Sequence, residues 1–135
     1  MEASESDELM AAAVAVSHHA SAPYSNIQVG AALRTADGET VCGANVESAS
    51  YGLTCCAERV ALFAALSQGH REFIEMGLVS SVTPHLLPCG ACRQLLAEYA
   101  PGLRIRCANR DNPASADELL IEELLPNALT RLPGD

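Results

Sequence analysis

Hydrophobic and polar positions along this chain are spaced as in a series of alternating helices and strands. An alanine-rich stretch opens with acidic residues, which favour the start of a helix. Two apolar segments then flank Asp37-Gly38, a dipeptide typical of a hairpin turn, and a longer apolar stretch ends at Gly69. The first half of the chain is therefore predicted to form a helix at 6–19, strands at 29–35 and 40–45, and a helix at 54–68.

The second half of the chain continues the alternation, with a helix predicted between Pro88 and Pro101. The predicted elements are strands at 74–80 and 103–107, a helix at 89–99, and a segment at 119–125 that is either a short helix or a strand leading into one. Because strands alternate with helices here, part of the sheet is expected to be parallel and to lie between helical layers. The length is that of one domain, covering residues 1–135.

Composition narrows the possible functions. The chain is 49% hydrophobic, so it can bury a core, and its formal net charge is -9. All basic residues are arginines scattered singly, and such an acidic surface repels a phosphate backbone, so no nucleic-acid partner is expected. No apolar run is long enough for a membrane span, and the acidic residues at 1–8 differ from the positive start of an export signal. We therefore expect no membrane association, a cytoplasmic location and reduced cysteines.

Two cysteine clusters carry the clearest chemical signal. Pro88-Cys89-Gly90-Ala91-Cys92 contains a C-x-x-C at a predicted helix start, which alone fits a redox pair, part of a zinc site or chance. Cys55 and Cys56 stand at a second helix start. The positive end of a helix lowers the pKa of a thiol and favours the thiolate, which is the form that binds zinc. If the two helix starts converge, they can hold one metal with two thiolates from the C-x-x-C and one from the pair.

The number of ligands decides between a structural and a catalytic zinc site. A structural site has four protein ligands, whereas a catalytic site keeps its fourth position for water. The other cysteine of the pair, His85, Cys42 or Cys107 offers a fourth ligand, although the last two are more simply explained as small buried residues in strands. Glu58 favours the open site. As a first-turn acid it complements the helix dipole, and beside a metal site it also supplies the group that acid–base chemistry requires.

The chain resembles the zinc-dependent nucleoside and nucleobase deaminases, whose signature matches Cys56-Ala57-Glu58 followed by Pro88-Cys89-x-x-Cys92. Six motifs fall in the order and spacing of the small homotetrameric cytidine deaminases: Ala22-Pro23-Tyr24-Ser25, Val29–Leu33, Asn45-Val46-Glu47, Cys56–Arg59, Pro88–Gln94 and Glu123–Pro126. The resemblance covers nearly the whole chain as far as Pro126. It implies an α/β fold of the cytidine deaminase type, a three-layer α/β/α sandwich around a mixed five-stranded sheet.

The resemblance also implies a role for each residue of the signature. It makes Cys56, not Cys55, the third metal ligand, and it gives Glu58 the proton transfers that convert cytidine or deoxycytidine to uridine or deoxyuridine, with release of ammonia, in pyrimidine salvage. Arg59 matches an arginine that hydrogen-bonds the ligating thiolates, whose excess negative charge a guanidinium offsets. The implied cofactor is one Zn²⁺ per chain, bound by Cys56, Cys89 and Cys92.

Further residues are implied as contacts to the substrate. Asn45 and Glu47 match residues that hold the ribose 3′-hydroxyl, since an amide beside a carboxylate provides both a donor and an acceptor. Ala57 is also expected at the substrate. The family usually has a phenylalanine packed on the pyrimidine where this chain has Ile27, and it tends to have a C-terminal phenylalanine in the same role where this chain has Leu129.

Three hypotheses follow. The first is deamination of cytidine and deoxycytidine. The second, raised by Ile27 and Leu129, is a zinc deaminase of another aminopyrimidine nucleoside such as a blasticidin S-type antibiotic. The third is a non-catalytic, zinc-stabilised binding module, against which Glu58 and Arg59 argue. Active sites in the resembled family are completed by neighbouring subunits, so a homotetramer is implied, with Tyr51 where the family makes subunit contacts.

Overall fold

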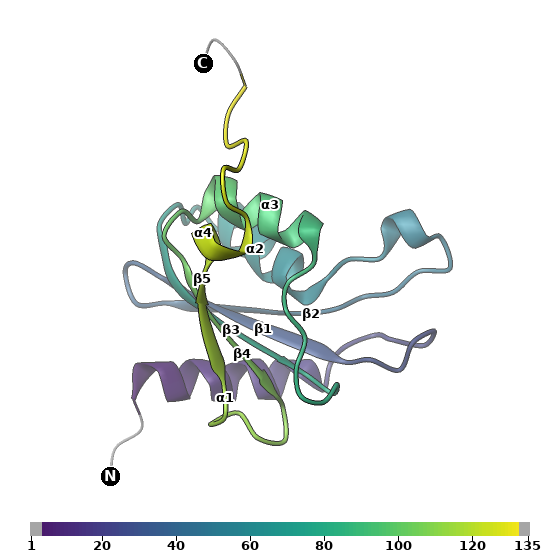
Figure 1. The fold of residues 1–135 in the computed structure, drawn as a ribbon. Coiled ribbons are helices and arrows are strands. Elements are labelled where there is room, and N and C mark those ends of the chain that lie inside the picture. Colours follow the sequence, from purple (N-terminus) through teal and green to yellow (C-terminus); the bar gives the residue numbers. More distant parts are fainter. Residues whose placement is uncertain (1–3, 133–135) are drawn as a thin grey trace.

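The fold is a mixed five-stranded sheet between two layers of helices, as the computed structural model of this chain shows for residues 4–132 (Figure 1). The predicted three-layer α/β/α sandwich is confirmed. Within the part of the chain that the structure describes, no helix has both the length and the apolar character to cross a membrane. The elements are α1 (Glu5–Ser17), β1 (Val29–Thr35), β2 (Thr40–Ala44), the 3₁₀ turn η1 (Tyr51–Leu53), α2 (Ala57–Ser67), β3 (Phe73–Ser80), α3 (Gly90–Tyr99), β4 (Arg104–Asn109), β5 (Asp117–Leu120) and α4 (Ile121–Leu124).

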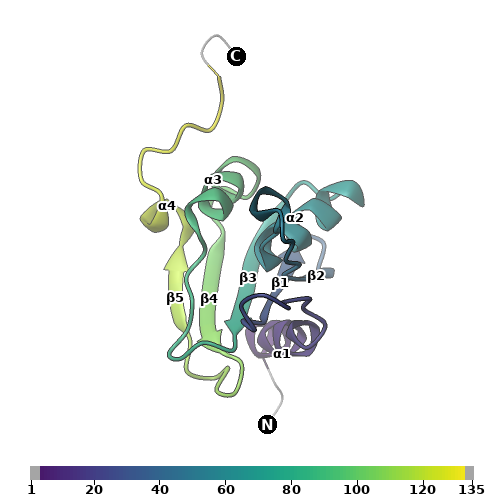
Figure 2. The same ribbon diagram turned by 90° about the vertical axis from the view of Figure 1, so that its right-hand side faces the viewer.

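The strands lie in the order β2-β1-β3-β4-β5. β3 and β4 are parallel, and every other neighbouring pair is antiparallel, so the expected parallel part of the sheet is this one pair. α1 covers one face of the sheet, and α2 and α3 cover the other (Figure 2). As a result, the N-termini of α2 and α3 lie on the same face of the sheet although they are far apart in sequence.

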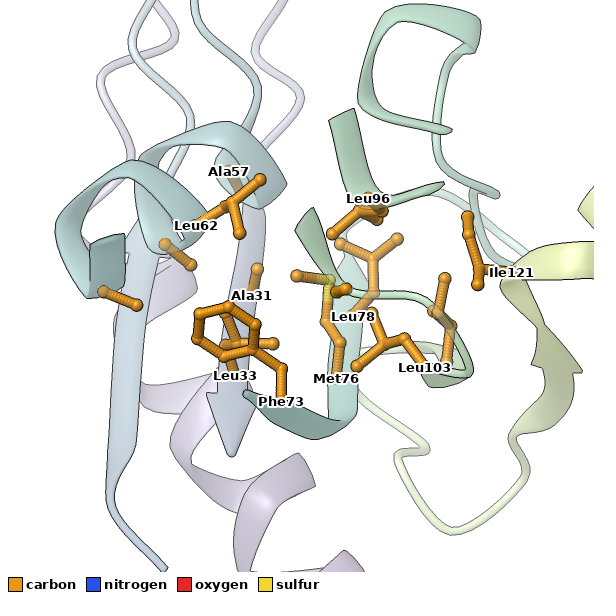
Figure 3. Close-up of a cluster of buried hydrophobic side chains, with 14 of the residues drawn as sticks. Ala31, Leu33, Ala57, Leu62, Phe73, Met76, Leu78, Leu96, Leu103 and Ile121 are labelled. Atoms are coloured by element: carbon orange, nitrogen blue, oxygen red, sulfur yellow. The ribbon is translucent and has the colours of Figure 1, made fainter. Parts of the chain in front are cut away.

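Two apolar clusters hold the layers together. The larger one lies between the sheet and the α2–α3 layer, where Leu62 and Leu96 meet Leu33, Met76 and Leu78 of β1 and β3 (Figure 3). The smaller one packs α1 on the other face of the sheet, through Leu9, Met10 and Ala13 against Ala32, Val79 and Ala108. The alternation of side chains along each strand thus supplies both faces of the sheet with apolar contacts.

The helix starts differ from the prediction in a way that matters for the site. α2 begins at Ala57 rather than at residue 54, and α3 begins at Gly90 rather than at Cys89. Cys56 and Cys89 are the N-cap residues and have extended backbone, with φ/ψ of -70°/153° and -68°/169°. The terminal segment is the strand β5 leading into α4, one of the two predicted alternatives.

Gly43 lets α2 lie close to the sheet. A Cβ atom on Gly43 of β2 would lie 2.5 Å from the backbone nitrogen of Ala61 and 2.9 Å from the carbonyl oxygen of Ala57. We expect Gly43→Ala to lower the free energy of unfolding by about 1–3 kcal/mol or more, because backbone atoms of a packed helix must move. Denaturant unfolding measures this effect, and Gly52→Ala, whose new Cβ meets open space, is the control. Equal stability of the two variants would contradict the close approach.

Candidate active site

The N-termini of α2 and α3 bring three cysteines together above the sheet. The Sγ atoms of Cys56, Cys89 and Cys92 all lie within 4.8 Å of one another, and those of Cys56 and Cys89 are 3.7 Å apart. An ion held tetrahedrally with zinc–sulfur bonds of about 2.3 Å requires sulfur atoms about 3.8 Å apart. The spacing of the thiols therefore fits a zinc ion.

The cluster contains three potential ligands, which leaves one tetrahedral position open. Among residues 4–132, no other His, Cys, Asp or Glu side chain joins this cluster. Of the alternatives raised by the sequence, His85 instead pairs with Asp117, at 2.6 Å from Nε2 to Oδ2. Cys107 is fully buried in β4, as expected for a small core residue, and burial raises the pKa of its thiol to about 12. Three thiols with an open position match the ligand count of a catalytic zinc rather than a structural one.

The charge distribution around the thiols favours a negative sulfur at Cys56. A hydrogen bond from Cys92 lowers the pKa of Cys56 to about 5, and the nearby Arg59 guanidinium acts in the same direction. The same hydrogen bond raises the pKa of Cys92, since it keeps the proton there. Arg59 reaches Cys56 Sγ at 3.6 Å and the carbonyl oxygen of Thr54 at 3.2 Å. The guanidinium therefore lies where it would offset the charge of ligating thiolates.

Glu58 is a buried acid next to this cluster. It is the second residue of α2 and is 5% exposed. Burial raises the pKa of its carboxyl group to about 7, because desolvation disfavours the charged form. An acid whose pKa lies near neutrality can both accept and release a proton in the physiological range.

A pocket of about 320 Å³ connects these groups with the other predicted substrate contacts. Its lining includes Cys56, Ala57, Glu58 and Cys89 at the helix starts, Asn45 and Glu47 after β2, and Ile27 before β1. Ala57 is fully buried as a whole residue and borders the pocket at the first turn of α2. The N–H groups of the first helical turn have no partner within the helix, which makes that backbone a potential donor.

Asn45 and Glu47 both bind the segment from Tyr24 to Val29. The Asn45 amide accepts a hydrogen bond from the nitrogen of Val29 at 2.8 Å and donates one to the carbonyl oxygen of Ile27 at 2.9 Å. Glu47 accepts bonds from the backbone nitrogens of Tyr24 and Ser25, at 3.0 and 3.1 Å, and from the Ser25 hydroxyl. The Ser25 hydroxyl holds the pKa of Glu47 below its usual range. Both residues thus shape the pocket wall as well as facing the pocket.

Leu129 lies outside this pocket. It lines a separate hollow with Gln94 and Glu98, and Gln94 Nε2 donates a 2.7 Å hydrogen bond to its carbonyl oxygen. The tail that carries Leu129 follows α4 and extends away from the sheet (Figure 1). Within one chain, Leu129 therefore has no contact with the pocket, and its role at the substrate stays a prediction.

The sequence interpretation missed Leu86 and Leu87, which line the pocket from the segment between β3 and α3. Leu87 is 43% exposed. Two adjacent leucines directly before Pro88-Cys89 were the available signal, because apolar side chains next to a chemical motif often face its ligand.

Comparison with known proteins points to the same chemistry. Residues 3–105 match the family model described as the cytidine and deoxycytidylate deaminase zinc-binding region. The cytidine deaminase of Halalkalibacterium halodurans is 47% identical over 109 residues, which cover 80% of this chain and 81% of the relative. The blasticidin-S deaminase of Bacillus cereus is 32% identical over 113 residues, covering 76% and 77%.

The fold gives the same result. The crystal structure of cytidine deaminase from Burkholderia pseudomallei superimposes with a TM-score of 0.85 and 44% sequence identity, covering 90% of this chain and 97% of that one. Fold, pocket and sequence therefore agree, and the chain belongs to the cytidine and deoxycytidylate deaminase family of enzymes.

Proposed function

We propose that this protein, acting as one domain, is a zinc-dependent enzyme that hydrolytically deaminates cytidine and deoxycytidine. The observation that carries the proposal is the pocket that combines the three-thiol cluster, the buried acid Glu58 and the polar pair Asn45 and Glu47. Deamination of an aminopyrimidine nucleoside requires a nucleophilic water at C4, a group that transfers protons, and polar side chains that bind the sugar. The thiol cluster, Glu58 and the Asn45–Glu47 pair would meet these three requirements in turn. The identity to the Halalkalibacterium cytidine deaminase supports the same substrate class.

Bound zinc, held by Cys56, Cys89 and Cys92, would supply a Lewis acid that makes water nucleophilic at neutral pH. Glu58 accepts a proton from the attacking water while the water oxygen forms a bond to C4. Glu58 then passes that proton to ring nitrogen N3. Glu58 then takes the remaining proton from the C4 hydroxyl and gives it to the amino nitrogen. The C4–N bond breaks, ammonia leaves, and the C4 oxygen becomes the carbonyl oxygen of the uracil ring. Burial raises the pKa of the Glu58 carboxyl group to about 7, so this group can both accept and release a proton near neutral pH.

Asn45 and Glu47 are proposed to bind the ribose 3′-hydroxyl. The Glu47 carboxylate accepts three hydrogen bonds from Tyr24 and Ser25, which leaves roughly one of its four lone-pair sites for a hydroxyl. The pocket wall and the sugar contact thus depend on the same carboxylate.

Glu47→Ala is expected to lower kcat/KM for cytidine by about 100-fold, because a small misplacement of the reacting ring has that effect. Steady-state kinetics measures the loss, with Glu118→Ala, an exposed acid on β5, as the control. The wild type should also turn over free cytosine far more slowly than cytidine. Equal rates for the base and the nucleoside would remove the sugar role from both residues.

The direct test of the function is the conversion of the cytidine absorbance spectrum to that of uridine by the purified, zinc-loaded protein. Deoxycytidine should react as well. Absence of turnover with both nucleosides would overturn the proposed function and leave two alternatives, deamination of another aminopyrimidine nucleoside and a zinc-stabilised binding module.

A second candidate substrate class is supported by two observations. The Bacillus cereus blasticidin-S deaminase is a relative, and large aliphatic side chains rather than aromatic rings line the pocket. An aliphatic wall is less selective for a flat, unsubstituted ring. Comparing kcat/KM for blasticidin S with that for cytidine decides between them, and a higher value for the antibiotic would favour the second candidate.

The resemblance to homotetrameric enzymes is supported by exposed apolar side chains near the pocket. Tyr51 and Leu53 of η1 are 87% and 72% exposed, and Tyr24 is 62% exposed. A neighbouring subunit that covers this surface would remove these side chains from water. We propose a cytoplasmic homotetramer, whose mass light scattering measures.

A further inference from the structure

We propose that Leu86 and Leu87 form an aliphatic wall that contacts the pyrimidine, and that the hydrogen bond between His85 and Asp117 holds this wall in place. The inference rests on the proposed function and names a contact of the same site.

The lining of the pocket shows what is available to contact the flat faces of a base. No aromatic side chain lines the pocket, within the part of the chain that the structure describes. Its large apolar residues are Ile27, Val29, Leu78, Leu86 and Leu87. Leu78 is 1% exposed and belongs to the core, whereas Ile27 and Leu87 are 36% and 43% exposed. A base that entered the pocket would remove these exposed aliphatic surfaces from water, and that burial is favourable.

Ile27 and Leu87 belong to two separate segments, which are linked by hydrogen bonds between Gln28 and Ser81. The backbone nitrogen of Gln28 donates to the Ser81 hydroxyl at 3.1 Å, and the backbone nitrogen of Ser81 donates to the carbonyl oxygen of Gln28 at 3.0 Å. The segment before β1 and the segment after β3 therefore flank one pocket from a common junction. Each segment offers one exposed aliphatic side chain to the same space.

The segment after β3, which carries Leu86 and Leu87, also makes hydrogen bonds to β4 and β5. Next to Leu86, His85 pairs with Asp117 at the start of β5, and the His85 side chain is 16% exposed. Asn109 at the end of β4 donates to the carbonyl oxygen of Val82 at 2.9 Å. These contacts tie residues 82–87 to the neighbouring strands, so the orientation of Leu86 and Leu87 depends on them. Neither His85 nor Asp117 lines the pocket, so they act by positioning.

Leu87→Ala is expected to raise KM about tenfold for cytidine and for deoxycytidine alike, with kcat changed by less than about twofold. The reason is that a wall against the base contributes equally to binding of the substrate and of the transition state. Leu87→Met keeps an apolar chain of similar length and should hold KM within about threefold of the wild type. Leu120→Ala, which removes a leucine of similar exposure on β5 outside the pocket, is the control.

His85→Ala tests the positioning pair. Alone it should raise KM about threefold, and in the Leu87→Ala background it should add almost nothing, because the side chain that it positions is already missing. An unchanged KM in Leu87→Ala, or full additivity of the two changes, overturns this inference while leaving cytidine turnover by the wild type intact. Absence of wild-type turnover overturns the proposed function, and this inference with it, so the two failures are distinct.

Discussion

Glu58→Gln is expected to abolish cytidine turnover while leaving zinc content and thermal unfolding close to those of the wild type. The amide has nearly the same shape as the carboxyl group but cannot accept the proton of the attacking water. General acid–base assistance typically contributes about 10²–10⁴-fold, and Glu58 handles more than one proton transfer. We therefore expect kcat to fall by about 10⁴-fold or more.

The matched control is Glu72→Gln, which makes the same chemical change at an exposed position outside the pocket. Single-turnover measurements with excess enzyme separate slow chemistry from weak binding in the variant. A Glu58→Gln enzyme with near wild-type kcat would exclude Glu58 from the proton transfers and would make its burial a matter of folding alone.

Cys56→Ala is expected to remove zinc and activity together. Two thiols would remain, and two ligands from one helix start make a poor cage for a tetrahedral ion. Zinc content measured by atomic emission should fall from about one ion per chain to about zero. The same loss is expected for Cys89→Ala and Cys92→Ala.

Cys55→Ala provides the control for this experiment. Cys55 is adjacent in sequence and lines the pocket, yet its sulfur is not part of the three-thiol cluster. The Cys55→Ala variant should therefore retain zinc and most of the activity. If Cys55→Ala lost the metal and Cys56→Ala kept it, the ligand assignment would be wrong.

Much of the fold was predictable because local and global signals agree. The Asp37-Gly38 turn between two apolar segments predicted the β1–β2 hairpin, and the two strands of this hairpin start at the predicted residues, Val29 and Thr40. The exact helix starts were less accessible. Nothing in the local pattern distinguishes a first helical residue from an extended N-cap cysteine, and the position of the metal-binding sulfur depends on that difference.

The candidate site was predictable where it is encoded in short motifs. The three thiols, Glu58 and the Asn45–Glu47 pair all face one region, as expected from the resemblance. The place of Leu86 and Leu87 in the pocket lining was signalled only by their position before Pro88-Cys89, because the path of this irregular segment is not encoded in a periodic pattern. The path of the C-terminal tail likewise determines that Leu129 lies away from the pocket of its own chain.

The double use of Asn45 and Glu47 has an evolutionary consequence. Each residue faces the proposed sugar position and also holds the segment that carries Ile27. A mutation that relaxes discrimination between sugars at either position would also displace part of the base-binding wall. With the proposed sugar role, a change in sugar preference at these positions therefore also changes the contacts to the base. New substrates are more accessible through changes at Ile27 or Leu87, which alter the wall and leave its hydrogen-bonded support intact.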